Sequence, residues 1–214
     1  NFSSDAITLQ ACQGVPVDSA ALHSLLDALR ANETADFAIV KLIRVLNFTS
    51  DYDTLIIPVL DSIPFWLTKG DTVRGYWSEN HMCQWMSSDW LLHEKFGKQV
   101  DSTLDYRLRH YLHLKVQYGF YEFFSSVYAP YCLSGLLNLA DFAQDAEIKT
   151  YATLAAQRLL KDILMLTNDK GVFFPAAGRN YYGKYETPYG QNHNNLIYLL
   201  TGMGQAPTSC SHAG

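Results

Sequence analysis

Apolar residues recur along this chain at intervals of three and four, the spacing of one face of an α-helix. In residues 18–31, Asp18 or Ser19 supplies an N-cap, and four leucines share one face: Leu22, Leu25, Leu26 and Leu29. The same spacing predicts helices over 34–46, from about 51, and over 78–96, 102–118, 127–143, 145–166 and 191 to about 202–204. We expect the helix after residue 51 to bend or stop at Pro58 or Pro64. Strand-like alternation is absent, so the pattern predicts an all-α fold.

The predicted helices differ in how polar they are. Residues 127–143 carry only a narrow polar stripe, formed by Ser134, Asn138 and Asp141, whereas residues 102–118 and 145–166 have broad charged faces. A helix that is apolar on most sides is enclosed by its neighbours. The alternation therefore predicts α-hairpins arranged in an inner and an outer layer.

A short repeat supports this arrangement. Glycine followed by aromatic or apolar residues occurs at 75–77, 119–121 and 171–174, each time after a predicted helix and about 50 residues apart, as in α-hairpin repeats. Each bend is followed by a glutamate: Glu79, Glu122 and Glu186. Stacked hairpins would bring the three bends to the same end of the molecule.

The net charge and the length of the apolar runs argue against two classes of partner, nucleic acids and membranes. The net charge of −5 over 214 residues argues against nucleic acid as the main partner. No apolar run reaches the roughly 18 residues of a membrane span, so we expect no membrane partner. Tyrosine, phenylalanine and tryptophan are plentiful and offer aromatic contact surface.

Three N-glycosylation sequons begin at Asn1, Asn32 and Asn47, which predicts a secreted protein whose signal peptide has been removed. Four cysteines without the close pairing of a zinc site then suggest two disulfides. We expect Cys12 to pair with Cys210, and Cys83 with Cys132.

Three segments lie where a predicted inner helix meets its loop: "GYWSENH" (75–81), "GFYEFFSSVYAPY" (119–131) and "GRNYYGKYE" (178–186). With the helical hairpins, they resemble the α/α-toroid proteins that act on carbohydrates, namely six-hairpin glycosidases and toroid-type polysaccharide lyases. The resemblance spans residues 15–204 and implies a single toroidal or partly toroidal domain over 1–214, with 1–16 and 205–214 as terminal extensions. Complete toroids contain more than the four hairpins counted here, so we expect either a shortened arc or a second chain or proteolytic fragment that completes the toroid as a partner.

The lyase resemblance implies elimination across a uronic acid, for which the substrate carboxylate must be neutralised and a carbon-bound proton removed. Toroid lyases use Asn, His, Tyr and Arg. The matching positions give Asn80 as neutraliser, His81 as base, Arg179 as partner of the carboxylate, and Tyr128 or Tyr182 as acid. Expected substrate-binding residues are Arg74, Tyr76, Trp77, Tyr121, Lys184 and His193.

Two other functions remain open. In the first, Glu79 and Glu122 act as the carboxyl pair of a glycoside hydrolase. In the second, the aromatic residues bind sugar without chemistry, and Ser78 and Glu79 form an ordinary helix start. His110 and His113 lack a further metal ligand, and the sequence has no phosphate loop or dinucleotide fingerprint, so we expect neither a metal nor a cofactor.

Overall fold

The computed structural model describes residues 6–31, 35–63, 78–122, 125–173 and 192–206. Within these ranges the protein is all-α, with one isolated β-bridge between Thr167 and Phe173 and no strand. The described helices are α1 (Ala6–Cys12), α2 (Ser19–Ala31), α3 (Asp36–Phe48), α4 (Asp53–Ser62), α6 (Glu79–Lys95), α7 (Ser102–Tyr118), α8 (Ala129–Phe142), α9 (Ala146–Met165) and α10 (Asn192–Thr201).

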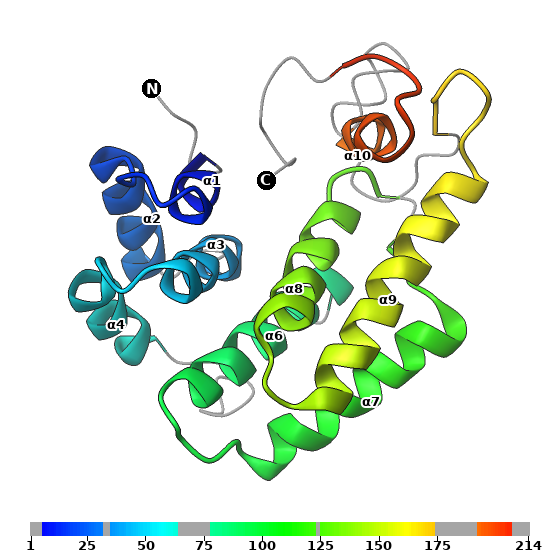
Figure 1. Cartoon of the computed structure of the whole chain (residues 1–214). Helices are drawn as coiled ribbons and strands as arrows, with labels where there is room; N and C mark the ends of the chain where they lie inside the picture. The colour runs from blue at the N-terminus through cyan, green and yellow to red at the C-terminus, as the bar shows by residue number, and fades with distance from the viewer. Residues whose placement is uncertain (1–5, 32–34, 64–77, 123–124, 174–191, 207–214) are drawn as a thin grey trace.

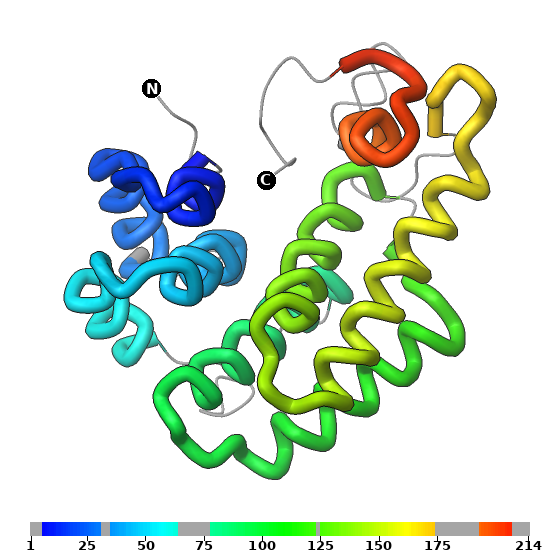
Figure 2. Tube along the Cα trace, in the orientation of Figure 1, coloured from blue at the N-terminus to red at the C-terminus, as the bar shows by residue number. Residues whose placement is uncertain are grey.

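The helices form two rows that alternate along the chain. The inner row runs α1, α3, α6, α8 and α10, each helix packing on the next, and in the outer row α2 packs on α4 and α7 on α9. Figure 1 shows the inner row bending, so that α1 and α10 lie at the same side of the view and α6 lies at the bend between them. Figure 2 follows the same path from the blue to the red end of the chain. The layering predicted from the polar stripes is therefore present.

Three outer helices begin with an aspartate that caps the first turn. The Asp18 carboxylate accepts the backbone N–H of Ala21, the Asp101 carboxylate that of Thr103, and the Asp145 carboxylate that of Glu147. Such a cap satisfies N–H groups that have no partner within the helix. These helix starts are thus fixed by residues adjacent in sequence.

The inner helices approach one another closely. Gly135 of α8 faces α6 so tightly that a Cβ at this position would lie 2.9 Å from Ser87 Oγ and 3.3 Å from the Cys83 carbonyl oxygen. Around this contact lies a continuous core that includes Leu42 of α3 and Leu139 of α8. The predicted enclosure of residues 127–143 results from α8 packing on both α6 and α9.

Two features extend the sequence-based expectations. The predicted N-terminal extension contains α1, which packs on α3 with Ile7 fully buried. Helix α4 continues through Pro58, because the burial of neighbouring apolar residues offsets the one backbone hydrogen bond that proline removes, and it ends at Ser62, just before Pro64, the second of the two predicted stops. Among the helices described, none is both long and apolar enough to span a bilayer.

Candidate functional site

The starts of three inner helices meet at one place. Phe37, in the first turn of α3, has its ring centroid 5.2 Å from that of His81 in α6 and 4.3 Å from that of Tyr131 in α8. None of the N-cap residues of these helices makes a side-chain capping bond. The positive ends of three helix dipoles therefore converge around His81.

His81 forms a close pair with Asp36, the first residue of α3. The His81 Nδ1 atom lies 2.5 Å from Asp36 Oδ2, and the exposed fractions of the two side chains are 15% and 0%. Burial raises the pKa of Asp36, while the contact with His81 acts in the opposite direction. Gln84 Nε2 donates to the same Asp36 oxygen at 3.2 Å. Asp36 is 45 residues from His81 in sequence, and only the packing of α3 on α6 brings them together.

Glu79, a candidate catalytic acid, is fully buried and ion-paired with Lys115 of α7. Its other oxygen accepts the backbone N–H of Glu122 at 2.8 Å. Burial raises the pKa of Glu79, and the Lys115 ammonium opposes that rise. Lys115 Nζ also lies over the rings of Tyr111, Phe120 and Tyr121, so aromatic faces complete its surroundings.

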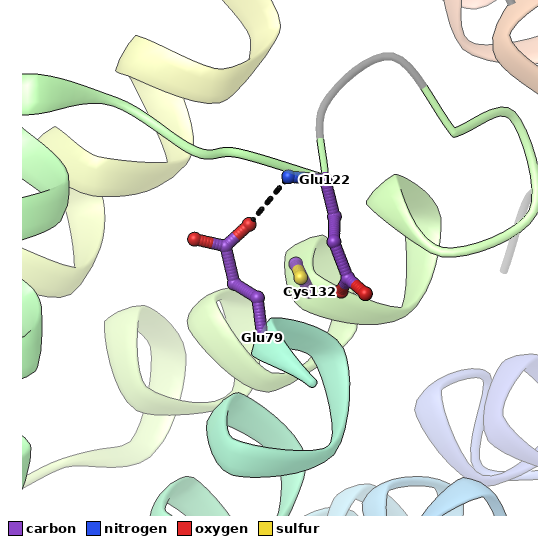
Figure 3. A group of neighbouring side chains, drawn as sticks. All are labelled: Glu79, Glu122 and Cys132. Atoms are coloured by element: carbon purple, nitrogen blue, oxygen red, sulfur yellow. Dashed lines mark hydrogen bonds between the residues drawn. The ribbon is translucent and has the colours of Figure 1, made fainter. Parts of the chain in front are cut away.

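Glu122, the second candidate acid, caps α6 from a distant part of the chain. Its Oε2 accepts the backbone N–H of Asn80 at 2.7 Å and the Asn80 side-chain amide at 3.0 Å. The two glutamates thus connect the α6 start with the segment after α7: Glu79 accepts the backbone N–H of Glu122 (Figure 3), and Glu122 accepts that of Asn80. Both carboxylates have structural partners, which argues against their use as a hydrolytic pair.

Asn80 is 1% exposed, and its amide group is fully engaged. Besides Glu122, the amide nitrogen donates to Ser78 Oγ at 3.1 Å, so two acceptors account for its two hydrogens. A carboxylate accepts only, which fixes the orientation of the amide. Asn80 therefore links the α6 start to Glu122 in the segment after α7. It has no amide hydrogen left to neutralise the carboxylate of a substrate, which was its predicted role.

Glu79, Glu122 and Cys132 place potential metal ligands within 4.8 Å of one another (Figure 3). The arrangement does not fit a cation, because the Lys115 ammonium already occupies the Glu79 carboxylate and the Glu122 oxygen is bound to Asn80. Burial also raises the pKa of the Cys132 thiol well above its ordinary value, which keeps it protonated. We assign this cluster a structural role.

The predicted disulfide between Cys83 and Cys132 is wrong: both residues are free, buried thiols. Cys83 Sγ lies 3.4 Å from the Cys132 carbonyl oxygen, so it approaches the backbone of α8. Burial raises the pKa of Cys83 to about 12 and makes the thiol unreactive. Cys12 is also free, and its predicted partner Cys210 lies outside the described residues.

The remaining candidates are distributed as follows. Tyr128 is half-buried at the N-cap of α8, and Tyr121 is 60% exposed beside Lys115. His193, at the start of α10, is fully buried against Phe173, and burial lowers its pKa to about 3, so it is neutral and shielded from solvent. Six predicted catalytic or substrate-binding residues lie outside the described residues: Arg74, Tyr76, Trp77, Arg179, Tyr182 and Lys184. The glutamate of the third bend, Glu186, also lies outside them.

Of the three sequons, only that of Asn47 is described, since Asn1 and Asn32 lie outside the described ranges. Asn47 is half-buried in the last turn of α3, and its amide nitrogen donates to the Ile43 carbonyl at 2.8 Å. That bond uses one of the two amide hydrogens.

Sequence reasoning missed three residues that the site depends on: Asp36, Gln84 and Lys115. Asp36 resembles any acidic residue in a first helical turn, and Gln84 lies within a mixed polar stretch, so neither carries a local signal. Lys115 does carry a local sequence signal, because it continues the apolar stripe of Leu104, Leu108 and Leu112. A lysine on a buried stripe indicates a buried acidic partner.

Comparisons of this chain with models of known protein families, with curated proteins and with solved structures found no match.

Proposed function

We propose that this chain is a secreted, carbohydrate-active protein of the α/α-toroid kind that cleaves uronate-containing glycans by β-elimination, with His81 as the general base. The alternation of inner and outer helices supports the architectural part, because the bent inner row has the layering of a toroid. The sequons support the extracellular part. The chemical part rests on the start of α6.

The observation that carries the proposal is the contact between His81 and Asp36. A carboxylate against Nδ1 holds the imidazole proton on that atom, so Nε2 becomes the nitrogen that accepts a proton. A partly exposed histidine held in this way suits the removal of a carbon-bound proton. In the elimination, the proton beside the uronate carboxylate moves to His81 Nε2. The electron pair of that C–H bond forms the C=C bond as the C–O bond to the leaving sugar breaks.

The surroundings suit an anionic substrate. The α3 and α6 starts already have the carboxylates of Asp36 and Glu122, whereas the α8 start carries no capping bond from its own N-cap residue, so its dipole would favour a negative group of the substrate. Tyr128 at the α8 start is the proposed donor of a proton to the leaving oxygen, with Tyr182 as the alternative. Arg179, helped by Arg74 and Lys184, is the proposed partner of the substrate carboxylate.

Sugar contacts in this proposal come from exposed aromatic side chains. Tyr121 is 60% exposed, and Lys115 Nζ lies 4.7 Å from its ring centroid, which anchors the ring. Tyr76 and Trp77, which come shortly before α6 in the sequence, are the other aromatic residues proposed to contact sugar. The buried partners of Glu79 and Glu122 favour this elimination over hydrolysis.

The test is incubation with polygalacturonate, alginate and hyaluronate, followed by ultraviolet absorbance and by an assay of reducing ends. Elimination creates a conjugated double bond, so absorbance and reducing ends should rise together. His81→Ala should lower the rate about 10²- to 10⁴-fold, the usual contribution of a general base. His110→Ala is the matched control, because His110 is an exposed histidine stacked on Tyr106, and it should keep the wild-type rate.

Three results would overturn the proposal. New reducing ends without absorbance would indicate hydrolysis. Binding of the polymers without either signal would indicate a non-catalytic sugar-binding protein. Full elimination activity in His81→Ala would remove His81 from the chemistry.

A further inference from the structure

A chain of hydrogen bonds lies behind His81. Gln84, one turn further along α6, is fully buried, and its Nε2 donates at 3.2 Å both to Asp36 Oδ2 and to the Asn80 carbonyl oxygen. Asn80 is held in turn by Glu122. The chain therefore connects the segment after α7, through the start of α6, to the carboxylate that contacts His81.

We propose that Gln84 is a positioning residue that aims the Asp36 carboxylate at His81 and thereby fixes the imidazole tautomer. The catalytic consequence rests on the proposed function, whereas the positioning itself is a property of the resting protein. Glu122, a candidate acid by sequence, becomes the far anchor of the same chain through its bonds to Asn80.

The geometry explains why Asp36 needs a second donor. The last torsion of an aspartate side chain is broad, so a single contact does not fix its rotation. Asp36 Oδ1 has no hydrogen-bond partner among the described residues, so both donors meet on Oδ2. Residues 81 and 84 lie on one face of α6, which presents the imidazole and the amide to Asp36 together.

The bond from Gln84 to Asp36 also affects which His81 nitrogen carries the proton. Because Gln84 and His81 share one carboxylate oxygen, loss of the amide removes one of the donors that hold the Asp36 carboxylate and weakens its bond to His81 Nδ1. A purely structural glutamine would cost stability when replaced but would leave the tautomer unchanged. The tautomer therefore separates the two roles.

The experiment records the ¹⁵N NMR shifts of the imidazole nitrogens in the full chain at a pH where His81 is neutral. Wild type should show the proton on Nδ1. In Gln84→Met, which keeps length and volume but removes the donor, the excess of this tautomer should fall about tenfold, as for loss of one hydrogen bond to a charged group. Asp36→Asn should show at least the same loss.

Ser87→Ala is the matched control. Ser87 is a fully buried polar residue of α6 whose hydroxyl donates to the Gln84 carbonyl oxygen at 3.1 Å, not to the Gln84 amide. It should retain the wild-type tautomer. A folded Gln84→Met with the wild-type tautomer would overturn the inference. If Gln84→Met does not fold, the wild-type spectrum still tests the proposal, because a proton on Nε2 would overturn it.

The elimination rate is a second measurement, and together with the tautomer it distinguishes failure of the positioning role from failure of the proposed function. The rate of elimination should fall about tenfold in Gln84→Met and stay unchanged in Ser87→Ala. If the tautomer shifts as expected but wild type eliminates no uronate polymer, the positioning stands and the proposed function fails. If wild type is active and Gln84→Met alters neither rate nor tautomer, the proposed function stands and the positioning fails.

Discussion

The inner and outer helices of this protein solve the same problem of unsatisfied first-turn N–H groups in different ways. The outer helices α7 and α9 begin with Asp101 and Asp145, which cap their own first turns. The inner helix α6 has no such bond from Ser78 and receives a carboxylate from Glu122, which is 42 residues from the Asn80 N–H it binds. The outer helices α7 and α9 are therefore capped by residues adjacent in sequence. The α6 start receives its capping carboxylate only after the chain has folded.

The charges differ in the same way. Arg109 of α7 is partly exposed and contacts Asp105, Asp145 and Glu147, so several carboxylates share one cation. Lys115, two turns along the same helix, is buried and has a single ion-pair partner among the described residues, Glu79. If Arg109 is lost, water can solvate its carboxylate partners. If Lys115 is lost, water cannot reach the buried Glu79 carboxylate.

The largest expected effect is on that buried pair. Lys115→Met leaves the Glu79 carboxylate buried without its cation and should lower the free energy of unfolding by about 3–5 kcal/mol. Arg109→Met, the matched change on the outer face, should cost about 1 kcal/mol, because its carboxylates remain hydrated. Urea unfolding followed by circular dichroism measures both.

The double variant Glu79→Met/Lys115→Met sharpens this prediction. It removes both buried charges and should recover part of the stability lost in Lys115→Met. Equal losses in Lys115→Met and Arg109→Met would show that burial does not distinguish the two cations.

An intermediate effect is expected where the inner helices touch. Gly135→Ala adds a methyl group 2.9 Å from Ser87 Oγ and 3.1 Å from Cys83 Sγ, so these buried side chains must shift or α6 and α8 must move apart. We expect a loss of about 1–3 kcal/mol in the free energy of unfolding. Ser87→Ala removes the nearest atom and should restore part of it in the double variant. A neutral Gly135→Ala would contradict the close packing of the inner row.

The smallest expected effect is a difference in the sign of pH dependence. The Arg109 guanidinium lowers the pKa of Asp145 from 3.8, so the stabilisation from Asp145 is present above that value and is lost as the pH falls through the lowered one. Burial raises the pKa of Asp36 from 3.8, so its contribution becomes less favourable as the pH rises from that value through the folded pKa.

Unfolding between about pH 3 and pH 7 tests these signs. The cost of Asp145→Asn should grow with pH, and that of Asp36→Asn should shrink. Costs that change in the same direction for both variants would remove the distinction between the inner and outer carboxylates.

The sequence determined the elements of the fold, because helical periodicity and polar stripes depend on neighbours within a few residues. The helices at 102–118 and 145–166, the enclosed helix at 127–143 and the two layers were predicted in this way. The same reasoning found His81 at a helix start. It missed α1, because tertiary burial outweighed weak local signals, whereas the helix after residue 51 ends at Ser62, just before Pro64, one of the two stops that it predicted.

Only the tertiary structure decided what the side chains at that start do. The pairing of His81 with Asp36, of Glu79 with Lys115 and of Glu122 with Asn80 depends on how α3, α6 and α7 rotate and pack against one another. The same packing leaves Cys83 and Cys132 as thiols. Contacts between residues more than 30 positions apart leave no periodic trace in a single sequence, so the partners of a buried charge become known only when the helices are in place.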